Sequence, residues 1–143
     1  MLIWNASPSQ PIGLYRIMRG LPRVSDRVLV RLRPQVANLA ARRGYLAPST
    51  YLIKPVAALN GDRICRLGTR IFVRGRFVAR ALVHDRLGRV LPTWQGCYNL
   101  RSGDLFLLAA DPDSFDSRYF GAVSSDAVTG RAILLWSLAP RGL

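Results

Sequence analysis

The sequence has no glutamate, one histidine and one lysine among its 143 residues. Without glutamate it cannot form the zinc-binding helix signature of metalloproteases or the glutamate pairs of many glycoside hydrolases. His84 is the only residue that could serve a Ser-His-Asp triad, and residues 83–88 have the composition of a hairpin end. Because loops hold polar residues at the surface, we interpret His84 as a surface turn residue. The glycines do not form a phosphate-binding GxxxxGK loop.

Cysteine is also scarce. Cys65 and Cys97 are too few to build a zinc site by themselves. His84 could add a third ligand, but none of these residues shows the short spacing of zinc ligands. A disulfide is expected if the domain is exported, and two buried thiols if it is not. We predict neither a metal nor a cofactor.

No long hydrophobic run is present. A bilayer-spanning helix needs about 18 or more apolar residues, whereas residues 132–138 form a run of strand length. The sequence contains no signal peptide with a charged start and an apolar centre. It opens directly on the strand-like residues 1–4. We therefore expect a membrane anchor that precedes Met1 in the full protein.

The chain is strongly basic, with a formal net charge of +13. This charge would suit nucleic acid or anionic lipid, so a basic β-domain that binds either one is the non-enzyme alternative. However, the arginines are spread from Arg16 to Arg141 without a block of five or six. Short alternations such as residues 31–33 and 74–76 are typical of the solvated face of a strand. We predict that function requires no nucleic acid.

Hydrophobic patterning predicts a mainly β domain of antiparallel strands with one or two short helices. Half of the residues are hydrophobic, and the length fits one domain, residues 1–143, with a real core. A helix is expected over residues 34–44, because Pro34 suits a first helical position and Gly44 can end it. Strands separated by glycine turns are expected over residues 2–6, 14–17, 27–33, 51–59, 63–66, 70–74, 76–83, 89–91, 104–109 and 131–137.

Lys54 is the most informative residue, because all other basic side chains except His84 are arginines. The residue usage of a GC-rich genome explains the scarcity of lysine, but it does not explain the position of this one. Lys54 lies in the apolar run 51–59, and on a strand it has apolar neighbours on both faces. Pro55 implies a sheet edge or a bulge beside it. A lysine at an edge with its amine reaching water is the simpler alternative.

The remaining catalytic chemistry is a serine activated by a lysine. A serine hydroxyl is a weak acid, so its attack on a carbonyl needs a base beside it. Burial can lower the pKa of a lysine toward neutrality, whereas an arginine stays protonated. Lys54 lies in an apolar run, so the sequence predicts the burial that would lower its pKa.

Three segments appear in a specific order: SQPIGLY at residues 9–15, KPVAALNGD at 54–62 and SFDSRYFG at 114–121. Over nearly the whole chain, this order resembles the signal peptidase I (S26) family of Ser/Lys serine peptidases. Within that family the chain is most similar to the TraF-type branch, which processes the pilin precursor of conjugal-transfer systems. The resemblance implies a partly open barrel of antiparallel sheets.

The resemblance also implies roles for individual residues. Ser9 matches the nucleophile and Lys54 the general base. Ser7 matches the hydroxyl that stabilises the oxyanion together with the backbone N–H of Ser9, since two donors aimed at the developing charge are the usual arrangement in acyl transfer. Ser114 matches a serine that orients the lysine amine. Two more positions match a structural acid–base pair of the family, Asp116 and Arg118.

The implied setting is the periplasmic face of the inner membrane, with the pilin precursor as the partner. The implied activity is cleavage, with cyclisation of the pilin as a second outcome of the same acyl-enzyme. A small β insertion is expected over residues 66–97. Because the periplasm is oxidising, the resemblance favours a Cys65–Cys97 disulfide at the base of this insertion.

Two departures from the family pattern bear on the substrate. Gln10 stands where general leader peptidases usually carry methionine. Residues 108–111 replace their Gly-Asp-Asn-Arg stretch. The Pro11-x-Gly13-x-Tyr15 continuation after Gln10 favours the conjugal branch, and the second departure weakens the alternative enzyme reading, a leader peptidase of broader range. The sequence does not define the cleavage site, the choice between hydrolysis and cyclisation, or the oligomeric state.

Overall fold

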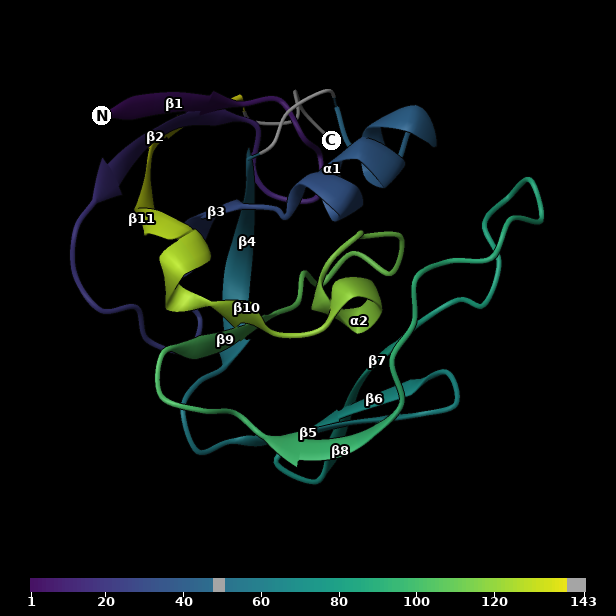
Figure 1. The fold of residues 1–143 in the computed structure, drawn as a ribbon. Coiled ribbons are helices and arrows are strands. Elements are labelled where there is room, and N and C mark those ends of the chain that lie inside the picture. The colour runs from purple at the N-terminus through teal and green to yellow at the C-terminus, as the bar shows by residue number, and fades with distance from the viewer. Residues whose placement is uncertain (48–50, 139–143) are drawn as a thin grey trace, which may run out of the picture.

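The protein consists of two antiparallel sheets with short helices packed around them. The structure is a computed structural model that describes residues 1–47 and 51–138. Figure 1 shows the larger sheet curling into a half-barrel and the second sheet at its lower end. The predicted class, mainly β with antiparallel strands and two short α-helices, is confirmed.

The larger sheet contains seven strands in the order β1-β2-β11-β3-β4-β9-β10, and each neighbouring pair is antiparallel. Strands far apart in sequence therefore lie side by side, and the C-terminal strand separates the second strand from the third. The bounds are β1 Leu2–Asn5, β2 Gly13–Met18, β3 Arg27–Arg31, β4 Tyr51–Ala58, β9 Asp104–Leu107, β10 Val123–Ser124 and β11 Val128–Ser137.

β3 and β4 form the buried centre of this sheet. The alternating Arg31 and Arg33 are exposed as predicted, whereas Val28, Leu29 and Val30 are each at most 2% exposed. Val28 and Val30 pack in one apolar cluster, while Leu29 packs in another on the opposite face. Both faces of β3 are therefore covered, and its arginines stand only at its two ends.

Pro55 lies in an internal strand, not at a sheet edge. β4 pairs with β3 along residues 51–55, but its pairing with β9 starts only at Val56 and shifts register before Ala58. The predicted irregularity beside the lysine is therefore present as this register shift. Proline fits there because it has no N–H to donate to a ladder.

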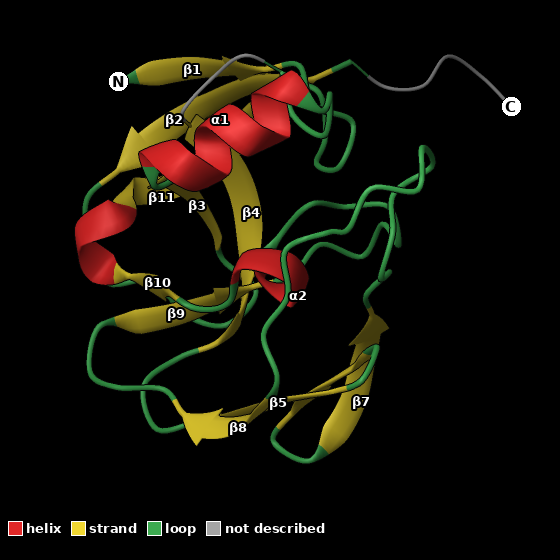
Figure 2. Cartoon of the chain, turned by 45° about the vertical axis from the view of Figure 1, so that its right-hand side comes forward, coloured by secondary structure: helices red, strands yellow, loops and turns green. Residues whose placement is uncertain are grey.

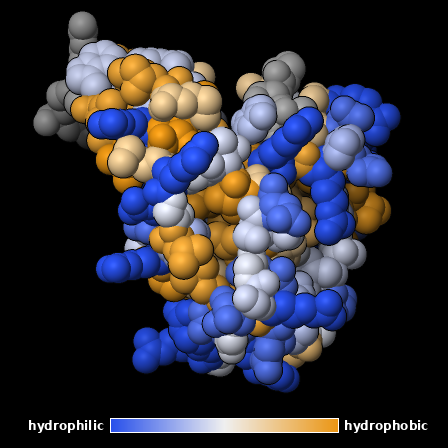
Figure 3. Space-filling model, turned by 60° about the vertical axis from the view of Figure 1, so that its left-hand side comes forward, coloured by the Kyte–Doolittle hydropathy of each residue, from blue (hydrophilic) through white to orange (hydrophobic). Residues whose placement is uncertain are grey.

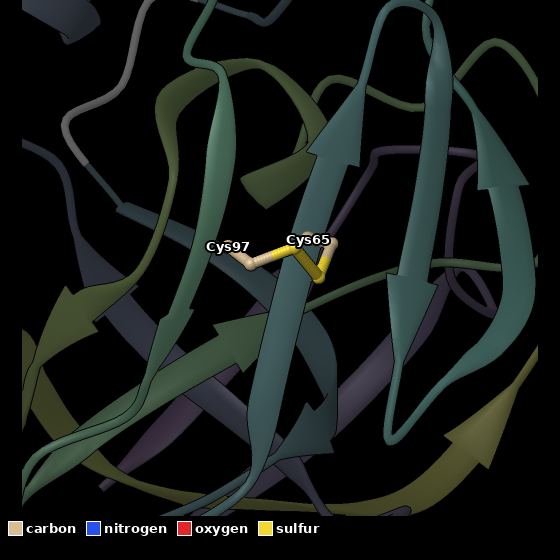
Figure 4. The surroundings of a disulfide bond; sticks show 2 residues. All are labelled: Cys65 and Cys97. Carbon is tan, nitrogen blue, oxygen red and sulfur yellow. A yellow bond between two sulfur atoms is a disulfide. The ribbon is translucent and has the colours of Figure 1, made fainter.

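The second sheet has the order β7-β6-β5-β8. Its strands are β5 Arg63–Leu67, β6 Arg70–Val73, β7 Arg76–Arg80 and β8 Gly96–Asn99. Cys65 and Cys97 are register partners on β5 and β8, and they form a disulfide (Figure 4). The predicted strand at 89–91 is wrong, because only a single bridge from His84 to Val90 forms there. The fourth strand is instead β8, which the sequence pattern did not indicate.

Three helical segments complete the fold: α1 Pro34–Arg42, α2 Ser117–Phe120 and the 3₁₀ turn η1 Ser125–Ala127. Figure 2 shows α1 and α2 beside the curled sheet. Pro34 begins α1 as predicted, and Gly44 follows its end with φ +73°, a conformation that suits glycine. Residues from α1, both sheets and α2 share one apolar cluster, which includes Ala40, Ile64, Ile71, Phe106 and Tyr119. This cluster joins the second sheet to the first. Among the described residues, no helix has the length and apolar character needed to cross a bilayer.

Candidate active site

Ser9 lies in a tightly braced loop between β1 and β2. The side chain of Asn5 donates to the carbonyl oxygens of Ser7 and Pro11 at 3.0 and 3.1 Å, and its oxygen accepts from the Ser7 N–H at 3.1 Å. The Tyr15 hydroxyl donates to Pro11 O at 2.7 Å. The loop is short and rich in turn residues, so these side chains supply the hydrogen bonds that a regular strand would provide.

The Lys54 amine reaches Ser9 from the buried centre of the sheet. Its Nζ lies 2.8 Å from Ser9 Oγ and 2.5 Å from Ser114 Oγ. Lys54 is 1% exposed and Ser114 is 3% exposed, so water is largely excluded around the amine. Three segments that are distant in sequence therefore bring two hydroxyls and one amine together.

Burial lowers the pKa of Lys54 from 10.5 to about 8. Desolvation is the main cause, because it disfavours the charged ammonium. The carboxylates of Asp116 and Asp111 oppose this shift, and the Arg118 guanidinium adds to it. About a tenth of the Lys54 amines are then neutral at pH 7 and half at pH 8. The amine can therefore take up a proton under ordinary conditions.

Ser7 stands beside the same hydroxyl. Its Oγ lies 3.2 Å from Ser9 Oγ, and either oxygen can be the donor. The free lone pair of a neutral Lys54 amine can accept from Ser9, whereas Ser114 Oγ accepts an N–H from that amine. This arrangement gives the Ser9 hydroxyl a base on one side and a second hydroxyl on another.

A buried ion pair holds the segment that carries Ser114. Arg118 Nε and Nη2 donate to the two Asp116 carboxylate oxygens at 2.8 and 3.0 Å, and both side chains are at most 2% exposed. Asp116 also accepts from the Ala109 N–H at 2.9 Å, and Arg118 donates back to Ala109 O at 3.0 Å. Arg118 Nη1 also donates to the carbonyl oxygen of Arg80, in the second sheet. The pair therefore ties the Ser114 segment both to the chain just after β9 and to the second sheet.

A pocket of about 460 Å³ opens beside Ser7 and Lys54. Apolar side chains from β1, β3 and β4 line most of it, including Ile3, Trp4, Leu29, Leu52 and Ile53. Such a pocket can take small or apolar side chains of a bound chain. Within residues 1–47 and 51–138, no three His, Cys, Asp or Glu side chains gather in an arrangement that could hold a metal ion.

Comparison with known proteins identifies the family. The family model described as signal peptidase, peptidase S26, matches residues 1–137. The chain belongs to the S26 signal peptidase family. This S26 member is 33% identical over 147 residues to the conjugal transfer protein TraF of Agrobacterium fabrum, a match that covers 95% of this chain and 82% of that protein. It is 34% identical to TraF of Agrobacterium tumefaciens over 150 residues, with the same two shares covered.

A third relative has a similar description. A probable conjugal transfer protein TraF of Sinorhizobium fredii is 31% identical over 148 residues, covering 95% of this chain and 77% of the relative. Among solved structures, a signal peptidase I from Enterococcus faecalis aligns with a TM-score of 0.45 and 18% identity, over 80% of this chain and 98% of that chain. The S26 family assignment makes the protein a serine peptidase.

In this S26 peptidase, the six candidate site residues from the sequence fall into two connected groups. Ser7, Ser9, Lys54 and Ser114 are joined by hydrogen bonds through the lysine amine and the Ser9 hydroxyl. The other two form the buried ion pair that lies two residues beyond Ser114.

Sequence reasoning missed the residues that brace the S26 peptidase site. Asn5 and Tyr15 hold the Ser9 loop, and Ser117 Oγ accepts from the Leu107 N–H at 2.9 Å while being fully buried. Gln10 was noted only as a departure from the family pattern. Only Asn5 gave a signal in the sequence: an asparagine at the end of a strand commonly forms hydrogen bonds with nearby backbone groups.

Proposed function

We propose that Ser9 and Lys54 form the catalytic dyad of this peptidase and that its substrate is the pilin precursor of a conjugal-transfer system. The observation that carries the proposal is the 2.8 Å contact between Ser9 Oγ and an amine that is 1% exposed and has a pKa of about 8. A hydroxyl and a lysine kept out of water at hydrogen-bonding distance are the two groups that this chemistry needs.

The reaction begins when neutral Lys54 accepts the proton of the Ser9 hydroxyl. The Ser9 Oγ forms a bond to the carbonyl carbon of the scissile peptide, and the negative charge moves to the carbonyl oxygen. The backbone N–H of Ser9 and the hydroxyl of Ser7 donate to that oxygen. The Lys54 ammonium then gives its proton to the leaving amine as the C–N bond breaks. The product of this half-reaction is an acyl-enzyme on Ser9.

The acyl-enzyme is resolved by a second nucleophile. Lys54 accepts a proton from water as the water oxygen bonds to the ester carbonyl carbon. The bond from that carbon to Ser9 Oγ then breaks, Ser9 Oγ takes the proton back from Lys54, and a linear product leaves. If the amino terminus of the same pilin attacks instead, the product is a closed ring that is lighter by one water. Ser114 keeps the amine oriented in both half-reactions, because it accepts an N–H from Lys54 Nζ.

The substrate binds as an extended chain along β4. The pairing of β9 with β4 begins only at Val56, and Leu52, Ile53 and Lys54 line the pocket beside Ser7. An extended peptide in this pocket can use backbone hydrogen bonds for affinity and place its side chains in apolar subsites. The conjugal-transfer names of the relatives support a pilin precursor as that chain.

The proposed location is the periplasmic face of the inner membrane. Exposed apolar side chains on the strands next to the Ser9 loop support it, and the Trp4 and Trp136 rings pack 5.8 Å apart there. Figure 3 shows hydrophobic surface at the upper left and across the middle of this view, whereas the lower end is mostly hydrophilic. Contiguous exposed apolar surface of this kind commonly marks a protein or membrane contact. The exposed residues are Leu2, Trp4, Ile133 and Trp136.

The test is to incubate the purified protein with a pilin precursor in detergent and to follow the products by mass spectrometry. Wild-type protein should produce a shortened pilin, either linear or lighter by one water, and Ser9→Ala should produce none. An unrelated exported precursor serves as the matched control and should stay intact. Equal cleavage of both precursors would support a general leader peptidase, and cleavage by Ser9→Ala would contradict the dyad.

A further inference from the structure

The two reacting groups are not neighbours in the sheet. The loop that carries Ser9 leads into β2, whereas Lys54 lies in β4, and both β11 and β3 stand between these strands. A displacement of about 1 Å in reacting atoms can cost two orders of magnitude in rate. The curled sheet alone would have to hold the Ser9–Lys54 distance across three strand-to-strand steps. A direct connection between the loop and the lysine region would fix it more tightly.

Gln10 makes such a connection. Its Oε1 accepts from Arg27 Nε at 2.7 Å, and its Nε2 donates to the carbonyl oxygen of Ser9 at 2.6 Å. Gln10 is 9% exposed, so this amide is not an exposed side chain that bonds mainly to water. The nitrogen and the oxygen of the Gln10 amide therefore each make a hydrogen bond, one to the Ser9 backbone and one to Arg27 at the start of β3.

Arg27 carries the connection to the lysine. It is the first residue of β3 and is the register partner of Pro55, the residue that follows Lys54. The next residue of β3, Val28, is the register partner of Lys54 itself. The contact therefore runs from the Ser9 peptide through Gln10 and Arg27 to the strand that pairs with the base. It bypasses β11 altogether.

An amide is the side chain that fits this position. A glutamate could accept from Arg27, but it could not donate to Ser9 O and would place its charge next to that carbonyl. A methionine would fill similar space without either hydrogen bond. The amide also holds the C=O of the Ser9–Gln10 peptide, whose N–H is directed at Ser7 O at 3.5 Å. Both polar groups of this peptide are therefore oriented.

We propose that Gln10 and Arg27 are positioning residues that set the Ser9 hydroxyl at reacting distance from Lys54. The proposal rests on the Ser9/Lys54 dyad proposed above. Neither residue touches the reacting atoms, and Arg27 is not among the charges that shift the pKa of Lys54. Loss of the pair should therefore change how often the hydroxyl is aligned, while the proton affinity of the base stays the same.

The experiment compares Gln10→Met, Gln10→Glu, Arg27→Ala and Arg27→Lys on the pilin precursor. For the first three variants we expect kcat to fall about 10- to 100-fold with KM within about twofold of wild type. The pH at which the rate is half-maximal should not move in Gln10→Met and Arg27→Ala, which add no charge. Arg27→Lys should recover part of the loss, because it keeps a donor that can reach Gln10 Oε1. Gln35→Met, at an exposed glutamine of α1, is the matched control and should behave as wild type.

Three results would overturn the proposal: wild-type kcat in both Gln10 variants, a change confined to KM, or a shift of the pH midpoint in Gln10→Met or Arg27→Ala that accounts for the lower rate. If Gln10→Met does not fold, the kcat values of Gln10→Glu and Arg27→Lys test the proposal instead, since each of these variants keeps the contact between positions 10 and 27. Ser9→Ala is measured in parallel. If it is inactive while the Gln10 variants are normal, only the positioning role fails. If it is active, the dyad fails and the positioning role fails with it.

Discussion

The Lys54→Arg variant should cleave the pilin precursor about 100- to 10,000-fold more slowly than the wild type, because general base catalysis contributes about 10²- to 10⁴-fold. Arginine keeps the positive charge and a long side chain, but its guanidinium does not lose its proton in a protein. It can donate to Ser9 and Ser114, yet it cannot take the Ser9 proton. The measurement is the single-turnover rate with enzyme in excess.

The pH dependence of the wild type provides a check on the same assignment. The base form of Lys54 increases about tenfold per pH unit below its pKa of about 8 and then levels off. The rate at low substrate concentration should follow this curve, whereas any residual activity of Lys54→Arg should not. Lys54→Met should be as inactive as Lys54→Arg, and thermal unfolding of both variants verifies that they are folded. Cleavage by Lys54→Arg within tenfold of wild type would contradict the role of Lys54 as base.

Arg118→Met should destabilise the protein by about 3 to 5 kcal/mol, the usual cost of removing one partner from a buried ion pair. The substitution leaves the fully buried Asp116 carboxylate without its charged partner. It also removes donors from the carbonyls of Ala109 and Arg80. The free energy of unfolding is measured by denaturant titration with the Cys65–Cys97 disulfide intact in both proteins.

The chain contains a matched control for this prediction. Arg74 and Asp62 form an ion pair of the same residue types at the same 2.8 Å distance, but the Arg74 side chain is half exposed. Arg74→Met should cost less than about 1 kcal/mol, because water and side-chain entropy offset an exposed pair. If Arg118→Met were no more destabilising than Arg74→Met, Arg118 would not hold the framework of the site.

The proposed reacting groups could be identified before the structure was known. A lysine in an apolar run is unusual enough to suggest a lowered pKa, and the resemblance of three ordered segments to the S26 family implied Ser9 and Ser114 as its partners. The strands of the larger sheet other than the two-residue β10 were also predictable, because runs such as residues 27–31 and 51–58 are rich in β-branched and other apolar residues. The apolar run around the lysine and the strand patterns are local properties that a single chain displays directly, whereas the two serines needed the family resemblance.

Contacts that depend on closure of the sheet were not predictable. Gln10 and Arg27 are 17 positions apart, and nothing in their local sequence indicates that they meet. The valine-containing run at 89–91 suggested a strand, whereas the real strand, β8, begins with a glycine and has three exposed residues. β8 exists because it pairs with β5. Four-residue α2 was too short for a helical period to appear.

The most direct test of this account is the pKa of Lys54 measured by NMR. Because Lys54 is the only lysine, protein labelled with ¹⁵N-lysine has one side-chain amine signal, and its shift can be followed from pH 6 to 11. We predict a single titration with a pKa of about 8, lowered from 10.5 because the amine is buried between Ser9 and Ser114. A pKa near 10.5 would mean that the amine is solvated and protonated, and would contradict its assignment as the base.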